Sequence, residues 1–562
     1  MLGSPLHENL LLRYHVAIED KPVFGREKLA IVSFYDDTNK RVAVLRFGVV
    51  EAKEIYKWID EGQELNLNNA YIMNFSLKEY RVERGLDDEA PVNLHNFSAK
   101  KALFDCEMET DFSFAVFEGP KTNFEAVIFG NGFVNFTGSD FGHGDVNFKK
   151  AKFGSGTSSF RSVKFGDGDV TFNNANFGTG DLSFVDANFS NGNVDFKNTY
   201  FGNGNVDFKF AKFAAGDVSF ERAAFGTGKK DFKNVEFGGG KIDFRRVDFN
   251  NGDVSFEGVE FGDGRVTYRN ATFGDGKKNF EQIDFGSGLA QFDLVQFGSG
   301  TVSFRKTRVH HISFASCPLN CFMDLRFASC DRIDLNSTIV RDILDMLPVD
   351  EVVVIKQMNV VDMRILGRIF LNWRDNNVHD LIYSQEDTSV HQKAEQFRVL
   401  KENFRNNGQY MDEDEAYVEF KRCEADGQLK DALHQNKWNA LWAYPNYYFQ
   451  RYVFDIVGRF GTDPVRVLMN AILTVFIFGI LYYLVSITVP DYGQIASTLP
   501  AELLSNGSFL NYVYYSAITF FTIGYGEYFP YGILKPLAAF EGFSGVFLMS
   551  YFTVAFVRKI LR

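Results

Sequence analysis

Two long apolar stretches lie near the C-terminal end of the chain. Residues 467–489 (VLMNAILTVFIFGILYYLVSITV) and 533–557 (ILKPLAAFEGFSGVFLMSYFTVAFV) are each long enough, at about 1.5 Å per residue of helix, to span a bilayer. Residues 511–521 (NYVYYSAITFF) are apolar but too short to cross. The pattern predicts a helix, a re-entrant helix and a second helix, because non-helical backbone at membrane depth is tolerated only where it lines a cavity. The alternative is two ordinary spans joined by an external loop.

A second pattern repeats every 12 residues through the middle of the chain. Aromatic residues occupy two registers, spaced alternately by five and seven residues. In the first register, from Phe124 to Phe304, fifteen of sixteen positions are Phe and the other is Tyr268. In the second register, from Phe129 to Phe297, all fifteen are Phe. Such a regular period predicts an array of stacked structural units.

Each unit contains two short segments that alternate with period two, as in residues 175–177 and 182–184. Each unit also has a glycine eight residues after its first-register aromatic, from Gly132 to Gly300. A glycine at a constant place predicts a corner that requires φ > 0. We expect the small and aromatic side chains to stack in ladders inside a solenoid.

Written as Ala-x-Phe-x-x, this repeat resembles the pentapeptide-repeat family, whose members form right-handed quadrilateral β-helices. The resemblance implies that two 12-residue units make one four-sided coil of 24, although every second pentapeptide here carries two extra residues. Beyond Val309 the spacing relaxes to five-residue steps and the glycines vanish, which is typical of a terminal cap. Residues 96–343 are therefore assigned to a β-solenoid with caps.

The other soluble segments are less regular. Residues 1–95 mix alternating apolar runs with one helix-like piece and predict a small α+β cap or docking domain. Residues 344–437 predict a helical linker with a hairpin whose turn is Asn406–Gly408, since apolar residues recur every three to four positions from Ala394 to Phe404. Residues 438–465 are rich in aromatic side chains with interspersed Arg. They predict an interfacial helix on the inner leaflet, or else one more packed soluble helix.

Charge gives an expected orientation. The segment 490–530 carries no Lys or Arg, only Asp491, Glu502 and Glu527, whereas basic residues precede the first apolar stretch and follow the second. The positive-inside rule then predicts an inner or plasma membrane protein with both termini in the cytoplasm. The net charge of −13 argues against nucleic-acid binding through phosphate contacts.

Candidate metal sites and catalytic motifs are weak. Cys317, Cys321 and Cys330 lie near His310 and His311, but their spacing fits no zinc template, and small apolar core positions are the favoured interpretation. The Gly-x-Gly-Asp corners resemble calcium-binding repeats, but their period is 12 rather than nine, which favours solvated corners. We find no phosphate-binding loop, nucleophile elbow or zinc-protease helix and expect no enzymatic activity.

The five residues after the short apolar segment read TIGYG. Successive backbone carbonyls point the same way, as ion coordination requires, only if backbone conformations alternate, and Gly524 and Gly526 tolerate φ > 0. The Thr522 hydroxyl can add one more ring of oxygens.

Residues 514–530 (YYSAITFFTIGYGEYFP) resemble the pore region of two-transmembrane potassium channels, and the resemblance covers residues 466–562. It implies an all-α channel domain in which four identical subunits surround one pore, with K⁺ ions as the only cofactor. The implied filter residues are Thr522, Ile523, Gly524, Tyr525 and Gly526. The implied supporting positions carry Tyr514, Tyr515 and Glu527, where the family usually has Trp, Trp and Asp.

The second apolar stretch also contains candidate gating residues. Gly542 and Gly545 could let that helix bend, or could allow close helix packing. An apolar constriction that closes by dewetting is expected from Phe552, Val554 and Phe556.

These observations predict a tetrameric potassium-selective channel regulated through a cytoplasmic solenoid with an unknown ligand or protein partner. Two alternatives stay open: a membrane-anchored scaffold whose solenoid is the functional module, and a non-selective cation channel.

Overall fold

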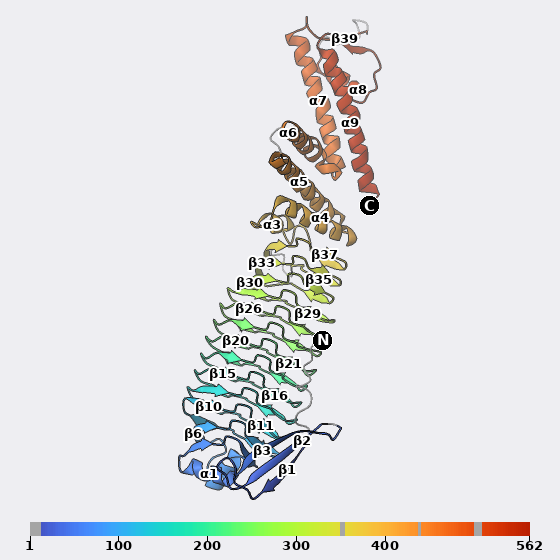
Figure 1. Cartoon of the computed structure of the whole chain (residues 1–562). Helices are drawn as coiled ribbons and strands as arrows, with labels where there is room; N and C mark the ends of the chain where they lie inside the picture. The colour runs from blue at the N-terminus through green and yellow to red at the C-terminus, as the bar shows by residue number, and fades with distance from the viewer. Residues whose placement is uncertain (1–12, 37, 349–353, 436–439, 499–507, 562) are drawn as a thin grey trace. The chain divides into compact units, whose positions relative to one another are not determined.

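The computed structural model describes residues 13–36, 38–348, 354–435, 440–498 and 508–561. The chain forms two compact units, Met1–Glu386 and Asp387–Arg562. The first is a β-solenoid of about 13 turns with a small α/β cap, and the second is helical (Figure 1). The predicted fold classes of solenoid and membrane domain are thus confirmed.

The solenoid coil has four sides and 24 residues. Val170 pairs in parallel with Val194 and Leu182 with Val206, each 24 residues further along. On the two sides between these strands, single bridges join Asn176 to Tyr200 and Asn188 to Lys212 with the same offset. The predicted pairing of two 12-residue units per coil is therefore confirmed.

Two long parallel sheets form opposite sides of the coil stack. The first contains β4 (Glu64–Asn66), β6 (Val92–Ser98), β10 (Lys121–Asn123), β13 (Asp145–Asn147), β15 (Val170–Thr171), β17 (Val194–Asp195), β20 (Val218–Ser219), β23 (Ile242–Asp243), β26 (Val266–Thr267), β28 (Leu289–Gln291), β30 (Arg308–Ser313), β33 (Ser329–Asp334) and β36 (Ile355–Asn359), with β9 (Ala115–Glu118) paired to β6. The second contains β8 (Glu109–Asp111), β12 (Phe133–Asn135), β14 (Ser158–Ser159), β16 (Leu182–Ser183), β18 (Val206–Asp207), β21 (Lys230–Asp231), β24 (Val254–Ser255), β27 (Lys278–Asn279), β29 (Thr301–Ser303), β32 (Phe322–Asp324), β35 (Ile343–Asp345) and β38 (Arg368–Phe370). Shorter sheets join β19 (Lys212–Phe213), β22 (Glu236–Phe237) and β25 (Glu260–Phe261), and β31 (Pro318–Leu319), β34 (Ile339–Val340) and β37 (Arg364–Ile365).

Phenylalanine ladders fill the interior, as the repeat predicts. Phe148 stacks on Phe172 with ring centroids 4.9 Å apart and an interplanar angle of 5°. The same Phe172 meets Phe184 edge-on, with centroids 5.7 Å apart. Stacked and edge-to-face aromatic pairs each add to the free energy gained from burial, so the ladder both stabilises the coil and fixes its register.

The predicted reason for the regular glycines is wrong at most positions. Of the fifteen regular glycines, which recur every 12 residues from Gly132 to Gly300, only Gly252, Gly276 and Gly300 have positive φ. At Gly180 a Cβ atom would lie 2.1 Å from the carbonyl oxygen of Gly156 in the preceding coil. Glycine is needed there because successive coils approach too closely for a side chain. The left-handed residue instead lies two positions after each first-register Phe, as at Asn174 with φ 58°.

The N-terminal α/β cap covers the first coils. Strands β1 (Arg13–Glu19), β2 (Leu29–Tyr35) and β3 (Arg41–Glu51) pair antiparallel, and β3 joins the parallel series β5 (Ala70–Met73), β7 (Leu103–Asp105) and β11 (Ile128–Phe129). Helices α1 (Ala52–Asp60) and α2 (Leu77–Arg84) complete the cap. Strand edges at a solenoid end are aggregation-prone, and this sheet covers them.

The strand ladder extends past both predicted boundaries, 96 and 343. It begins at β4 and continues through β36, β37 and β38, so the first part of the predicted helical linker 344–437 forms strands. The last coils contain apolar residues such as Met358 and Ile369, which are buried without the Phe and Gly signature. Helix α3 (Val378–Tyr383) follows and packs on β36, and the Gln357 amide donates to the Ser384 carbonyl at 2.9 Å. Helical structure therefore begins about thirty residues later than predicted.

The cysteines and histidines near the end of the solenoid are not gathered into one cluster. Cys317, Cys321 and Cys330 are each 1% exposed, and burial raises the pKa of the Cys317 thiol to about 12 and that of Cys321 to about 11. His310 lies 2.6 Å from Asp331, and His311 lies 2.7 Å from Asp334. The thiols thus serve as small apolar core groups in this part of the solenoid.

Two lysines occupy interior positions of the second long sheet. Lys230 pairs between Val206 and Val254, and Lys278 between Val254 and Val302. Both are 1% exposed. Each Nζ donates to a backbone carbonyl of the next coil, Lys230 to Asn251 and Lys278 to Ser299. Burial lowers the pKa of Lys230 to about 8.

The second unit contains a helical hairpin and three helices of the membrane domain. The hairpin pairs α4 (Val390–Asn406) with α5 (Tyr410–Gln435) across the predicted turn, where Gly408 has φ 74°. Next come α6 (Ala440–Phe449), the π-helical η2 (Gln450–Ile456) and the 3₁₀ turn η3 (Arg459–Gly461). Of the predicted interfacial segment 438–465, residues 438 and 439 lie outside the described residues. Its exposed aromatic side chains include Trp442, Tyr448 and Tyr452.

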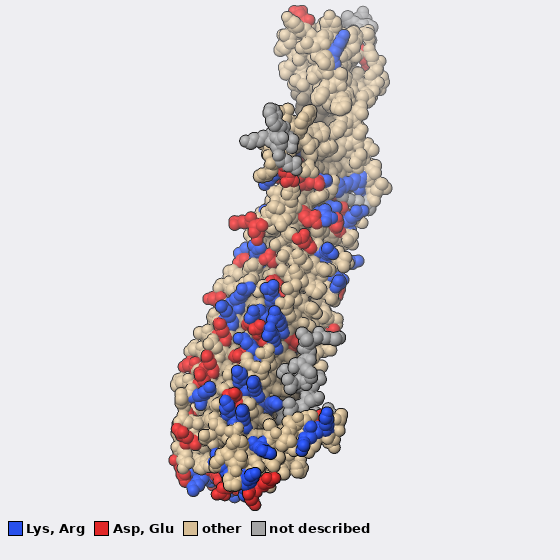
Figure 2. Space-filling view, viewed as in Figure 1, with Lys and Arg blue, Asp and Glu red and all other residues tan. Residues whose placement is uncertain are grey.

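The membrane domain closely follows the predicted arrangement of helices. It comprises α7 (Pro464–Thr488), the short α8 (Phe509–Phe520) and α9 (Leu534–Ile560), with a small antiparallel pair, β39 (Ile495–Ser497) and β40 (Tyr528–Pro530). Both α7 and α9 are long and apolar enough to cross a membrane. Figure 2 shows that the surface over these helices is nearly free of charged side chains, whereas charges of both signs gather over α4 and α5.

Candidate pore and its coupling surface

The candidate filter segment, residues 522–526, follows the short helix α8 directly. Positive φ occurs at every second residue, with 54° at Thr522, 60° at Gly524 and 88° at Gly526. The Ile523 amide donates to the Ile518 carbonyl at 2.8 Å and the Thr522 amide to Thr519 at 3.1 Å, so the start of the segment caps α8. This is the alternating backbone that brings successive carbonyls to one side.

The filter side chains have little packing within a single chain. Ile523 is 50% exposed and Tyr525 is 67% exposed. No described atom lies within 4 Å of a Cβ built on Gly524 or Gly526. Apolar side chains on a segment with such strained backbone need further support, which one chain does not supply.

The predicted supporting residues divide into two roles. The Tyr514 hydroxyl donates to the Glu527 carboxylate at 2.6 Å, which links α8 to the residue just after the filter. The Glu527 carbonyl in turn accepts from the Thr498 amide at 3.0 Å. Tyr515 points elsewhere: it is buried, and its ring lies edge-on to Tyr482 of α7 with centroids 5.0 Å apart.

A buried carboxyl group behind α8 was missed as a site residue. Glu541 of α9 is 0% exposed and accepts hydrogen bonds from the hydroxyls of Tyr482 on α7, at 2.6 Å, and Ser516 on α8. Ser516 also lies 2.8 Å from the Val475 carbonyl. Glu541 therefore joins all three helices of the membrane domain. The only sequence signal was a carboxylate within an apolar span.

The two candidate hinge glycines have different surroundings. A Cβ on Gly545 would lie 1.9 Å from the carbonyl oxygen of Phe520, the last residue of α8, whereas one on Gly542 would meet its nearest atom at 3.8 Å. Helix α9 is continuous through both positions. Gly545 thus permits the close approach of α9 to the base of the filter, which supports the packing role.

The candidate constriction residues lie toward the C-terminal end of α9. Val554 is 65% exposed and Phe556 is 47% exposed in the single chain, and the rings of Phe552 and Phe556 are 5.7 Å apart. These three predicted residues therefore form an apolar surface on α9 that is largely exposed in the single chain at Val554.

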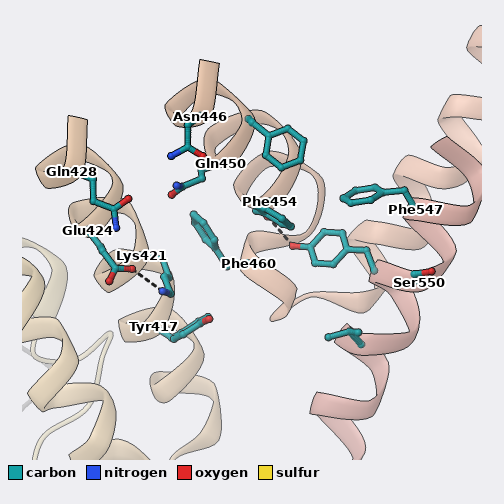
Figure 3. A pocket seen from close by; sticks show the side chains of 13 residues that line it. Tyr417, Lys421, Glu424, Gln428, Asn446, Gln450, Phe454, Phe460, Phe547 and Ser550 are labelled. Atoms are coloured by element: carbon teal, nitrogen blue, oxygen red, sulfur yellow. Dashed lines mark hydrogen bonds and ion pairs between the residues drawn. The ribbon is translucent and has the colours of Figure 1, made fainter. Parts of the chain in front are cut away.

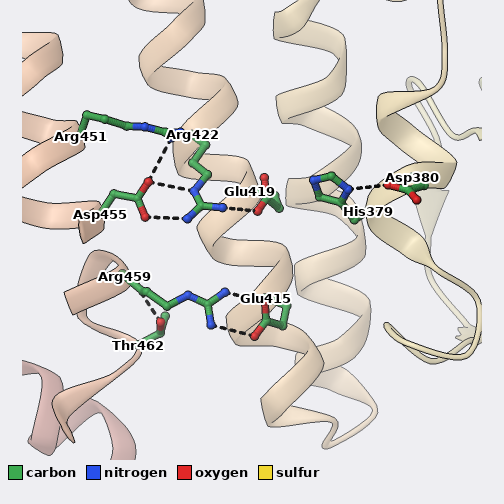
Figure 4. A network of polar contacts seen from close by, with 9 residues as sticks. All are labelled: His379, Asp380, Glu415, Glu419, Arg422, Arg451, Asp455, Arg459 and Thr462. Carbon is green, nitrogen blue, oxygen red and sulfur yellow. Dashed lines mark hydrogen bonds and ion pairs between the residues drawn. The ribbon is translucent and has the colours of Figure 1, made fainter. Parts of the chain in front are cut away.

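Ion pairs fasten α5 to the segment that precedes α7 (Figure 4). The Arg422 guanidinium of α5 donates twice to Asp455, at 2.8 and 2.9 Å, and Arg451 donates to the same carboxylate at 3.0 Å. Asp455 is only 3% exposed. Two turns earlier in α5, Glu415 accepts two hydrogen bonds from Arg459, at 2.6 and 3.0 Å. These hydrogen bonds raise the pKa of both Arg422 and Arg459 above the ordinary value, so the guanidinium groups stay charged.

Helix α5 also contacts the C-terminal end of α9. Asp414 lies 3.0 Å from Lys559 and 3.5 Å from Arg558. The Arg558 guanidinium stacks over the Tyr417 ring at 4.1 Å. One helix of the hairpin therefore holds both the entry to the first span and the end of the second.

A cavity of about 650 Å³ lies among α5, the segment before α7 and α9 (Figure 3). Its walls include the aromatic rings of Phe454, Phe460 and Phe547. Tyr551 of α9 donates to the Phe454 carbonyl at 2.8 Å, and Lys421 lies 2.6 Å from Glu424 at the other side. The gate candidate Val554 lines the same cavity.

Comparisons with known proteins identify the C-terminal region. Residues 471–562 match the family model described as ion channel. No curated protein and no solved structure matches the chain. The matched residues contain most of α7 and all of α8, the filter segment and α9. The C-terminal part of this chain is therefore an integral-membrane domain of the ion channel family, of the two-membrane-helix type, and it follows a β-solenoid.

Proposed function

We propose that the chain forms a potassium-selective channel of four subunits, with Thr522 to Gly526 as its selectivity filter. The observation that carries this proposal is the alternation of φ at Thr522, Gly524 and Gly526 directly after a short re-entrant helix. Rings of carbonyl oxygens from several chains can then replace the hydration shell of K⁺. The Thr522 hydroxyl would add the innermost oxygens.

The exposed filter side chains support assembly. Ile523 and Tyr525 leave half or more of their surface exposed in one chain, and neighbouring subunits around a central axis would cover them. The bare apolar residues of α9, including Val554 and Phe556, would line the inner part of the same pore and close it by dewetting.

Regulation would reach the pore through α5. Its ion pairs with Asp455 and Arg459 hold the segment that leads into α7, and its contacts with Arg558 and Lys559 hold the end of α9. A displacement of the hairpin by the solenoid would therefore move both spans together.

The scaffold alternative receives less support. One form of such a scaffold is an acidic pentapeptide-repeat solenoid that resembles DNA in shape and charge, which requires a uniformly negative surface. Figure 2 shows Lys and Arg interspersed with Asp and Glu on the visible face of the solenoid. A non-selective cation channel remains the second candidate, since its filter would use the same backbone.

A flux assay tests the proposal. Purified full-length protein in liposomes should take up K⁺ and Rb⁺ against an excess of external Na⁺, and Gly524→Asp should abolish uptake. Equal permeation of Na⁺ would favour the non-selective alternative.

A further inference from the structure

A polar cavity of about 630 Å³ lies where the α4–α5 turn meets the C-terminal end of α9. It is separate from the aromatic cavity described above, sharing only Tyr417 among its lining residues. Its polar lining includes Lys401 and Arg405 of α4, Tyr410, Glu413 and Tyr417 of α5, and Arg558 of α9.

The cavity has more positive than negative charge. Lys401 and Arg405 are one helical turn apart and therefore lie on the same face of α4. Neither forms an ion pair with any residue that the structure describes. The third cation, Arg558, stacks on Tyr417 and lies 3.5 Å from Asp414. Glu413 is the one carboxylate among the lining residues, so the lining itself carries a net charge of +2, and Asp414 behind Arg558 offsets part of it.

This arrangement favours an anion. Like charges one turn apart on a helix repel each other, and a bound anion removes that repulsion. The cavity also lies at the N-terminal end of α5, a helix of 26 residues, whose macrodipole favours negative charge. A phosphate group matches this lining best, because its oxygens accept paired N–H donors from arginine while lysine supplies a point charge.

We propose that Lys401, Arg405 and Arg558 form a binding site for a phosphate group with net negative charge, carried either by an acidic membrane lipid or by a soluble ligand. A lipid can supply this group because Arg558 stands at the end of a membrane span, where headgroups lie. A bound phosphate would join α4 to α9, which adds a link between the hairpin and the second span. The binding claim itself does not depend on potassium selectivity.

The test uses full-length protein in nanodiscs and follows thermal unfolding. One arm adds inorganic phosphate to protein in phosphatidylcholine nanodiscs, with chloride at matched ionic strength as the reference. The other arm compares phosphatidylcholine nanodiscs with nanodiscs containing one fifth phosphatidylglycerol. Arg405→Gln removes one proposed contact, and Lys430→Gln is the matched control, because Lys430 is an exposed cation on α5 outside the cavity lining.

A rise in the unfolding midpoint with inorganic phosphate would identify a soluble source, and a rise only with phosphatidylglycerol would identify a lipid source. In either case Arg405→Gln should require about tenfold more ligand for the same rise in the unfolding midpoint, while Lys430→Gln leaves this concentration unchanged. No rise in either arm, or an equal response in both variants, would overturn the proposal. Circular dichroism of Arg405→Gln establishes that the variant is folded.

Discussion

The Glu541 carboxylate in the second span accepts a hydrogen bond of 2.6 Å from the Tyr482 hydroxyl in the first, while Ser516 of the short helix donates to the same group. The three residues are far apart in the sequence but meet at the side chain of Glu541, which is fully buried. The helix that precedes the filter is therefore held by polar contacts from both spans.

Removing one donor from this site should destabilise the membrane domain. Tyr482→Phe leaves the buried carboxyl one hydrogen bond short, with an expected loss of about 1–3 kcal/mol in the free energy of unfolding. Tyr483→Phe is the control, because its ring packs against Phe509 and Tyr512 and no described residue bonds its hydroxyl. Thermal unfolding in detergent measures both, and equal midpoints for the two variants would contradict the assignment.

Gly545→Ala tests close packing at the base of the filter. The added methyl group would overlap the Phe520 carbonyl, so we expect a loss of about 1–3 kcal/mol together with altered channel activity. Gly542→Ala should be tolerated, because its nearest neighbour would be 3.8 Å away. If Gly545 acts only as a hinge, its substitution would change open probability and leave the unfolding midpoint of the protein where it was.

The interior lysine Lys230 predicts a specific pH dependence. Its pKa is lowered to about 8 in the folded state, against 10.5 when exposed, so between these values the unfolded chain binds more protons. Lys230 should therefore make the solenoid more stable as the pH rises from about 8 to 10.5, by up to about 3 kcal/mol in the free energy of unfolding. Below pH 8 the cost of burying the charged ammonium group should be fully present.

Lys230→Met should stabilise the solenoid at pH 7 and remove this part of the pH dependence. Val254→Met, the next position of the same ladder, controls for side-chain size. Denaturant unfolding followed by circular dichroism supplies the comparison. The prediction would be refuted if the difference in unfolding free energy between the wild type and Lys230→Met stayed constant from pH 7 to 10.5.

The ion pairs of α5 should differ in strength. Asp455 is almost fully buried and binds both Arg422 and Arg451, so Asp455→Asn should lower the free energy of unfolding by about 3 kcal/mol. Glu415 and Arg459 are partly exposed, and Glu415→Gln should lower the free energy of unfolding by about 1 kcal/mol or less. Thermal unfolding ranks the two variants. A larger loss of stability for Glu415→Gln than for Asp455→Asn would contradict the predicted order.

Much of this architecture is readable from the sequence where one physical constraint acts at regular spacing. The coil of 24 follows from the Phe period, and the predicted hairpin turn at Asn406–Gly408 follows from the break in helical periodicity. Only the reason for the glycines differs, since Gly180 is required by contact with Gly156 of the preceding coil rather than by its own φ.

The remaining features depend on contacts between distant segments. The final coils around Met358 and Ile369 are stacked on earlier coils but carry no Phe or Gly signature, so their strands were predicted as part of a linker. Glu541 was visible only as a charge within a span, because its partners come from two other helices. The pairing of Asp455 with Arg422 likewise joins residues 33 positions apart.

Potassium selectivity is tested by the reversal potential of purified protein in planar bilayers, with K⁺ on one side and Na⁺ on the other. A potassium-selective pore gives a potential that follows the K⁺ equilibrium potential as the K⁺ gradient is varied, and its current disappears with Gly524→Asp. A reversal potential near zero with sustained current, equal for K⁺ and Na⁺, would contradict potassium selectivity.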